Sequence, residues 1–231
     1  MCLDSVVEGR AITESQTGTT LLGTDLGGVR RAFDTVADAY ATQFVHELSR
    51  KPMDRDLLDA FTRRVGNGPV LDLGCGPAGH VGRYVHDRGP SVTGVDFSAR
   101  GIESARRLNP TMDFVVADIR QLPFPDASIA GIVAFYCLIY GTETDIVGAL
   151  AEARRVLPPG GVLLAAVHGG VGTGHFDDFL GTPVDMTIRY TSAEEIRDMA
   201  VRAGLAVEEV LAREPYADEH PTTRIYLRAT R

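Results

Sequence analysis

Apolar residues recur at helical spacing in the first part of the chain. One stripe, in steps of three and four, predicts an amphipathic helix through Phe33, Val36, Ala37, Tyr40, Phe44 and Leu48. A second stripe at residues 57–65 predicts another helix, which ends at the breaker cluster of residues 66–69. Residues 1–27 are rich in Thr, Ser and Gly without a sustained period. We therefore expect a flexible N-terminal arm at residues 1–27 and a helical cap over residues 28–66.

Short apolar runs alternate with helical patterns from residue 69 onward. The runs predict five strands, at residues 70–73, 92–95, 114–116, 129–135 and 162–167. The segments between them have the length of crossover helices. This alternation predicts an α/β fold with a parallel, doubly wound sheet, whose core is residues 69–168.

The last part of the chain breaks this rhythm. Residues 169–191 form a glycine-rich, acidic insertion, for which we expect a lid over the active face or, alternatively, a cover for the sheet edge. Ser192 and Glu195 form a capping box, which predicts the start of a helix. Two strand-like runs follow at residues 205–211 and 224–229. Because no long linker occurs, residues 28–231 are expected to be one domain that ends in a helix and strands, residues 192–231.

Composition narrows the class of protein. The 231 residues are 44% hydrophobic and 23% charged, which is typical of a globular protein. The formal net charge of −8 disfavours a nucleic-acid partner. No run approaches 18 apolar residues, so we expect no membrane partner and a cytoplasmic location. Three cysteines without CxxC spacing predict neither a disulfide scaffold nor a metal site.

A glycine-rich turn follows the first predicted strand. Residues 70–79 place Gly74, Gly76 and Gly79 in a literal GxGxxG between a strand and a helix. The pattern is also compatible with a plain tight turn, because glycine serves any such connection. Asp96 ends the second strand, 17 residues after Gly79, where an acid can accept hydrogen bonds from both hydroxyls of a ribose. Together these features predict a nucleoside ligand.

The acids around this turn indicate which nucleoside it is. Asp72, two residues before Gly74, would repel the pyrophosphate of a dinucleotide but would favour a cationic ligand. S-adenosylmethionine carries a sulfonium and an amino group beside its adenosine, so it fits better than NAD. Asp118, after the third strand, is placed to accept the adenine amino hydrogen. The three acids would line the crevice at the carboxyl ends of adjacent strands.

The ordered motifs resemble those of the class I S-adenosylmethionine-dependent methyltransferases, from about Phe33 to the C-terminus. They lie at residues 70–79, 94–98, 116–119 with 122–124, and 155–161. The resemblance implies a Rossmann-like sheet of seven strands, mostly parallel with the last strand antiparallel. The two strand-like runs at the end of the chain agree with that count.

The resemblance also implies roles for single residues. Gly74 and Gly76 would let the backbone approach the methionine part of S-adenosylmethionine, and Asp96 would hold the ribose. Asp118 and Ile119 would hold the adenine. These residues place the cofactor across residues 69–168.

Further residues complete the predicted cofactor site. Ala134, in the fourth strand, would line the methionine end, and Cys75 and Phe97 stand within the first and second motifs. Cys75 is also compatible with a small buried apolar role. Tyr40 in the cap would place an aromatic face near the sulfonium, or else belong to the apolar core. Tyr136, after the fourth strand, is a further candidate for cofactor contact.

Candidates for the chemistry lie after the fourth and fifth strands. His168 follows the fifth strand and is the candidate general base, although a hydrogen bond to the neighbouring loop would explain it as well. Tyr140 stands where related methyltransferases often have a histidine, and its phenol can orient an acceptor. His175, Asp177 and Asp178 resemble metal ligands by type, but a solvated acidic loop explains them better. We predict no metal.

These observations predict an S-adenosylmethionine-dependent methyltransferase, of the kind classified under EC 2.1.1, that acts on an N or O atom of a small organic molecule. Tailoring of secondary metabolites is one such role, and S-adenosylhomocysteine would be the product. We expect a monomer or a homodimer. Alternatives that remain open are a nicotinamide-dependent oxidoreductase, a non-catalytic nucleoside-binding module, and a protein or RNA methyltransferase, since the same core serves all methyltransferases.

Overall fold

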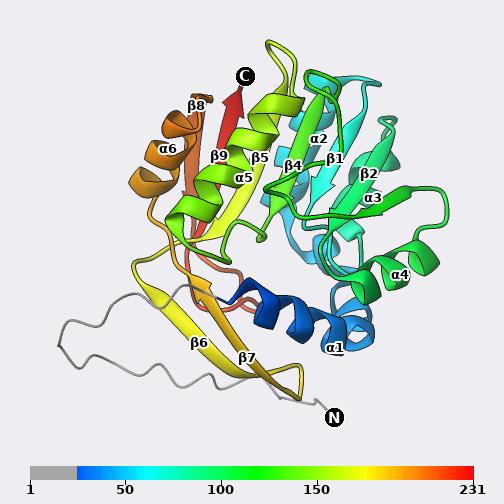
Figure 1. The fold of residues 1–231 in the computed structure, drawn as a ribbon, viewed down its shortest axis with the longest axis vertical. Helices are drawn as coiled ribbons and strands as arrows, with labels where there is room; N and C mark the ends of the chain where they lie inside the picture. Colours follow the sequence, from blue (N-terminus) through cyan, green and yellow to red (C-terminus); the bar gives the residue numbers. More distant parts are fainter. Residues whose placement is uncertain (1–24) are drawn as a thin grey trace.

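The main sheet has seven strands within residues 25–231, the part of the chain that the computed structural model describes (Figure 1). Its order is β3-β2-β1-β4-β5-β9-β8, comprising β1 (Val70–Leu73), β2 (Val92–Asp96), β3 (Asp113–Val116), β4 (Gly131–Phe135), β5 (Val162–His168), β8 (Ala206–Arg213) and β9 (Arg224–Thr230). Strands β1 to β5 pair in parallel, and β9 runs antiparallel to β5 and β8. The predicted Rossmann-like, mostly parallel sheet with an antiparallel last strand is confirmed.

Helices cover both faces of this sheet. Successive residues of a strand point to opposite faces, so they pack in two separate apolar cores, one on each face. Ile132 of β4 packs in one core and Val133 in the other. The first core contains residues of α5 (Glu143–Val156) and α6 (Ala193–Arg202). The second contains residues of α2 (Pro52–Val65), α3 (His80–His86) and α4 (Ala99–Leu108). The capping box predicted at Ser192 and Glu195 is present and begins α6.

The connection between β3 and β4 departs from the predicted alternation. Residues 117–130, all within the described part, form turns where a crossover helix was expected. Pro123 and Pro125 lack the backbone N–H that a helix interior needs. Instead, the Arg155 guanidinium donates hydrogen bonds to the carbonyl oxygens of Leu122 and Phe124. The expectation of a helix here is wrong, because prolines and an arginine brace favour an irregular path.

The N-terminal cap consists of two α-helices joined by a short 3-10 helix. α1 (Leu26–Phe44) begins after Asp25, whose side chain accepts a hydrogen bond from the Gly27 N–H. η1 (Glu47–Arg50) follows, and Pro52 lies in the first turn of α2. α1 therefore starts at Leu26, within the segment 1–27 that was predicted to be a flexible arm. The rest of that arm, residues 1–24, lies outside the described residues.

The insertion at residues 169–191 contains a β-hairpin that the sequence did not predict. β6 (Thr173–Phe179) pairs antiparallel with β7 (Thr182–Arg189) around Leu180 and Gly181, both of which have positive φ, 57° and 74°. The hairpin forms a small sheet apart from the main one. β7 packs against α1, below the carboxyl ends of the parallel strands (Figure 1). This location agrees with the predicted lid, whose closing function stays a prediction.

Candidate functional site

A cavity of about 1250 Å³ lies at the carboxyl ends of the parallel strands, lined also by residues of α1 and of the β6–β7 hairpin. Its two ends differ in chemistry. Gly74, Gly76 and Asp96 line the cavity at the ends of β1 and β2, and His168 and Arg224 line it at β5 and β9, on the other side of β4 in the sheet. Ligand pockets commonly measure roughly 300–1,000 Å³. The cavity therefore has room for a nucleoside cofactor and a second small molecule.

The turn after β1 needs glycine for both conformation and space. Gly74 and Gly76 have φ values of 63° and 61°, in the left-handed region that other residues avoid. A Cβ at Gly74 would lie 2.2 Å from the Cβ of Cys137. The Gly74 N–H donates to the Val95 carbonyl oxygen at 2.7 Å, which joins the turn to the end of β2. Both predicted glycines thus lie at the cavity wall, where their backbone is not covered by a side chain of their own.

Asp96 is the acid best placed to bind a ligand at this end. It ends β2, is 6% exposed and lines the cavity, as does its neighbour Phe97. Oδ2 accepts a hydrogen bond from the Gly76 N–H at 3.0 Å, and Oδ1 accepts one from the Ser98 N–H at 2.8 Å. Burial raises the pKa of Asp96 to about 6. One carboxylate therefore fixes the glycine turn and keeps lone pairs for a ligand.

Asp118 and Ile119 also line the cavity, as predicted for an adenine site. Asp118 does not act alone, because the Arg120 guanidinium contacts both of its oxygens, at 3.0 and 2.7 Å. Hydrogen bonds from Arg120 lower the pKa of Asp118. Arg120 also pairs with Asp145 of α5. Arg120 was not predicted. The only feature of the sequence that points to it is its position two residues after Asp118.

Three of the predicted cofactor-contacting residues, Asp72, Cys75 and Ala134, are not among the residues that line the cavity. Asp72 is buried beneath the turn, where Oδ2 accepts a hydrogen bond from the Gly82 N–H at 2.8 Å, and burial raises its pKa to about 7. Cys75 and Ala134 are packed in the two apolar cores. These three side chains lie behind the cavity wall, and their expected contact with the cofactor stays a prediction.

Aromatic rings from the cap, the β4 end and the hairpin gather over the cofactor end. The Phe33 ring centroid lies 5.9 Å from that of Tyr40, 5.6 Å from that of Tyr140 and 6.5 Å from that of Phe179. Tyr40 also faces the turn, since a Cβ at Gly76 would lie 3.5 Å from its ring. Burial raises the pKa of both Tyr40 and Tyr140, so both phenols stay protonated. This arrangement suits an aromatic cover for a cofactor.

His168 and Tyr136 lie side by side at the other end of the cavity, with ring centroids 5.1 Å apart. Nδ1 of His168 lies 2.8 Å from Oγ1 of Thr222. Burial, helped by the nearby Arg224, lowers the pKa of His168 to about 3. A group with that pKa is a poor proton acceptor near neutral pH, which disfavours the general-base role expected for His168; that role stays a prediction. Tyr136 has a positive φ of 57°, a strained conformation that residues other than glycine rarely adopt.

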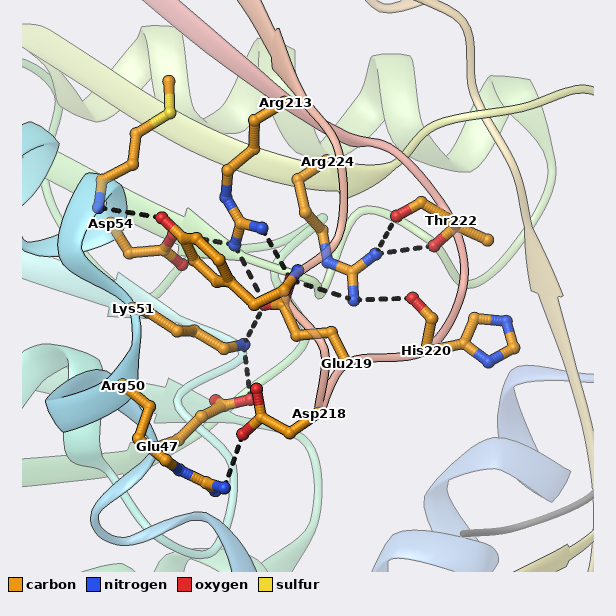
Figure 2. Close-up of polar contacts among 12 residues, drawn as sticks. Glu47, Arg50, Lys51, Asp54, Arg213, Asp218, Glu219, His220, Thr222 and Arg224 are labelled. Atoms are coloured by element: carbon orange, nitrogen blue, oxygen red, sulfur yellow. Dashed lines mark hydrogen bonds and ion pairs between the residues drawn. The ribbon is translucent and has the colours of Figure 1, made fainter.

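A network of buried ion pairs surrounds this second end (Figure 2). Lys51 lies 2.5 Å from Glu47 and 2.9 Å from Glu219. Arg213 contacts both oxygens of Glu219, at 2.6 and 2.9 Å, and one oxygen of Asp54 at 3.1 Å. Sequence reasoning missed this network because its members come from the cap and from the β8–β9 connection, with no shared motif.

The residues weighed as metal ligands are spread along an exposed strand. His175 faces Thr187 and Asp185 of β7, with Nδ1 3.4 and 3.9 Å from their oxygens. Within residues 25–231, His, Cys, Asp and Glu side chains form no cluster that could hold a metal ion. In the same range, no helix is long and apolar enough to cross a membrane.

Comparison with known proteins identifies the core of this fold. Residues 70–161, which contain the glycine turn, Asp96 and Asp118, match the family model described as a methyltransferase domain. Residues 70–161 of this chain therefore form a methyltransferase domain. The resemblance and the cofactor class expected from the motifs are thereby confirmed, which disfavours the nicotinamide-dependent alternative.

Relatives of the methyltransferase domain differ in what they act on. The chain is 34% identical over 143 residues to the malonyl-[acyl-carrier protein] O-methyltransferase of Enterobacter lignolyticus, covering 60% of this chain and 53% of that protein. It is 34% identical over 139 residues to the demethylmenaquinone methyltransferase of Tropheryma whipplei, covering 59% and 57%. The chain thus spans about half the length of these curated relatives.

Solved structures share the fold at low sequence identity. The 1,6-didemethyltoxoflavin-N1-methyltransferase of Burkholderia thailandensis, with its substrate and S-adenosylhomocysteine bound, has a TM-score of 0.67 at 18% identity, covering 93% of this chain and 94% of that one. The [4+2]-cyclase SpnF has a TM-score of 0.61 at 21% identity, covering 86% and 96%. The fold alone therefore does not fix the reaction.

Proposed function

We propose that this protein transfers the methyl group of S-adenosylmethionine to an N or O atom of a small organic molecule. The observation that carries the proposal is the cavity with two chemically different ends, one built by the glycine turn and Asp96, the other by His168 and Arg224. A cofactor that fills the first end leaves the second for an acceptor. The apolar walls between them favour a small organic acceptor over a charged polymer.

The residues at the first end fit S-adenosylmethionine. Asp96 would accept hydrogen bonds from the ribose hydroxyls while keeping the Gly76 N–H in place. Asp118 and Ile119 would contact the adenine, and Tyr40 would lie near the sulfonium. When bound, S-adenosylmethionine supplies an activated methyl group. The protein then contributes alignment of the acceptor and exclusion of water.

The second end favours an acceptor that needs no deprotonation before attack. Burial and Arg224 lower the pKa of both His168 and His220, and burial raises the pKa of Tyr136. These three side chains are therefore poor proton acceptors near neutral pH. An amine nitrogen or a carboxylate oxygen already carries a free lone pair. Both classes satisfy the expectation of an N or O acceptor.

The direct test is turnover with a panel of small amines and carboxylic acids. We expect release of S-adenosylhomocysteine and a product heavier than its acceptor by one CH2 group, measured by mass spectrometry. Binding of S-adenosylhomocysteine without turnover of any acceptor would instead support the non-catalytic nucleoside-binding module. A product of unchanged elemental composition would indicate a rearrangement or cyclisation on this fold.

A further inference from the structure

We propose that the second end of the cavity is a carboxylate-binding subsite, in which His168 and Arg224 hold the acid group of a small amphipathic acceptor. This inference deepens the proposed function and rests on it, because the acceptor is assigned to this end. It depends on three features: the charge around Arg224, the tautomer of His168, and the apolar wall opposite them.

Arg224 has unused hydrogen-bonding capacity although it is almost fully buried, with 2% of its surface exposed. One of its terminal nitrogens, Nη1, donates to the backbone and hydroxyl oxygens of Thr222, and Nη2 donates to the His220 carbonyl oxygen at 3.1 Å. Its Nε–H has no partner among the described residues. A buried donor without a partner carries a free-energy penalty, so the protein does not fully satisfy this cationic side chain at the cavity wall.

The nearest carboxylate forms only a long ion pair with Arg224. Glu219 Oε2 is 3.8 Å from Nη2, beyond hydrogen-bond distance, and Glu219 already accepts from Arg213 and pairs with Lys51. Figure 2 shows Glu219 between these three cations, with Arg224 on the side of His220. Lys51 and Arg213 each have a second carboxylate partner, Glu47 and Asp54, whereas Arg224 has no carboxylate within hydrogen-bond distance among the described residues. Arg224 therefore keeps positive potential at the cavity wall.

The contacts of His168 favour the tautomer that donates from Nε2. The Thr222 hydroxyl oxygen accepts a hydrogen bond from Arg224 at 2.7 Å and lies 2.8 Å from Nδ1 of His168. An arginine only donates, so the hydroxyl hydrogen of Thr222 is free to be donated to Nδ1. Nδ1 is then the unprotonated nitrogen of a neutral imidazole, and Nε2 carries the hydrogen. This chain of contacts leaves His168 with an N–H to offer a ligand oxygen.

The electrostatic environment of His168 agrees with an anionic ligand. Arg224, His220 and Lys51 all add to the effect of burial in lowering its pKa, and Glu219 opposes them only in part. Lys51 and Arg224 also approach the ring of Tyr136, at 5.4 and 5.7 Å from its centroid. The field that makes His168 hard to protonate would attract a carboxylate.

The opposite wall indicates what the carboxylate is attached to. Phe176, Met186 and Ile188 of the β6–β7 hairpin line the cavity, and Met186 and Ile188 are 3% and 5% exposed. Phe176 lies close to His220, with ring centroids 5.7 Å apart. The subsite therefore fits an acid with an apolar or aromatic body, whose carboxylate faces Arg224.

The test compares acids with their own amides, because the two differ mainly in charge. Aromatic and aliphatic carboxylic acids, including 2-naphthoate, and the matching primary amides are titrated calorimetrically into the protein saturated with S-adenosylhomocysteine. We expect the best acid to bind at least about tenfold more tightly than its amide. We expect Arg224→Gln to remove this preference without altering S-adenosylhomocysteine affinity. Arg228→Gln, on the same strand in a half-exposed pair with Glu209, is the matched control and should keep the preference.

A second measurement does not depend on the stability of Arg224→Gln. Nitrogen-15 NMR of the wild-type imidazoles should show His168 with a protonated Nε2 and an unprotonated Nδ1 at neutral pH, and Thr222→Val should remove that single tautomer. Equal binding of acids and amides, no binding of any acid, or a protonated Nδ1 would overturn the subsite. Failure of S-adenosylhomocysteine itself to bind would instead overturn the proposed function.

Discussion

Replacing Asp96 with asparagine tests how the cofactor end is built. The two carboxylate oxygens each accept a backbone N–H, from Gly76 and from Ser98. An amide offers a single acceptor oxygen, so its NH2 group must face one of these donors. Leaving one buried N–H without an acceptor costs about 1–3 kcal/mol of unfolding free energy. For a chain of this size, each kcal/mol lowers Tm by about 2–4 °C.

The effect on cofactor affinity should be larger. Two hydrogen bonds from ribose hydroxyls to the Asp96 carboxylate contribute about 1.5–3 kcal/mol each. Their loss is expected to weaken S-adenosylmethionine binding by at least about 100-fold, since 1.4 kcal/mol corresponds to a factor of ten. Isothermal titration calorimetry measures this directly. An affinity within threefold of wild type, in a folded Asp96→Asn protein, would refute the ribose-binding role.

The same residue predicts a pH dependence. Asp96 has a pKa of about 6 in the unliganded protein, and its protonated form has lost one of the lone pairs that the ribose needs. Binding should therefore be nearly full above about pH 7 and fall as the pH drops through 6, by about tenfold at pH 5. Asp96→Asn should show a flat profile in this range. A step that persists in Asp96→Asn but disappears in Asp72→Asn would assign the titration to Asp72.

Three further substitutions test other parts of the account. Asp72→Asn should raise Tm at pH 8 more than at pH 5. Burial raises the folded-state pKa of Asp72 to about 7, so ionisation of Asp72 destabilises the folded wild-type protein as the pH rises to 7, by up to about 4 kcal/mol. Equal Tm shifts at both pH values would contradict this. Gly74→Ala should abolish cofactor binding, checked by calorimetry, because the added Cβ meets Cys137 at 2.2 Å and φ is 63°. Arg213→Gln should lower the unfolding free energy in denaturant by about 3–5 kcal/mol, because it removes the cation that pairs with both buried carboxylates, Asp54 and Glu219; a change below about 1 kcal/mol would refute that pairing.

The cofactor end could be predicted because its signals are local in sequence. A fully buried strand followed by Gly74 and Gly76 allows few conformations other than the turn that the structure shows. Asp96 could be predicted from the next strand because parallel strands bring their carboxyl ends to one edge. The placement of Asp72 could not be predicted in this way, since strand spacing does not show that its side chain turns toward Gly82 beneath the turn.

The acceptor end and the hairpin could not be predicted in the same way. Lys51 and Glu219 form an ion pair although they are far apart in the sequence. Taken singly, a lysine or a glutamate is typical of a solvated surface position. Arg224, at the start of a strand, is 2% exposed, and its guanidinium donates to the carbonyl oxygens of Thr222 and His220 in the β8–β9 connection. In the hairpin, the register shifts between Phe176 and Asp178, which disrupts the alternation that marks a strand.

Calorimetric titration of the wild-type protein with S-adenosylmethionine, S-adenosylhomocysteine and NAD in parallel tests the central claim most directly. It needs no knowledge of the acceptor. The account predicts micromolar binding of the two S-adenosyl ligands at one site per chain and no binding of NAD. Binding of NAD, or failure of both S-adenosyl ligands to bind, would contradict the assignment of this cavity to methyl transfer.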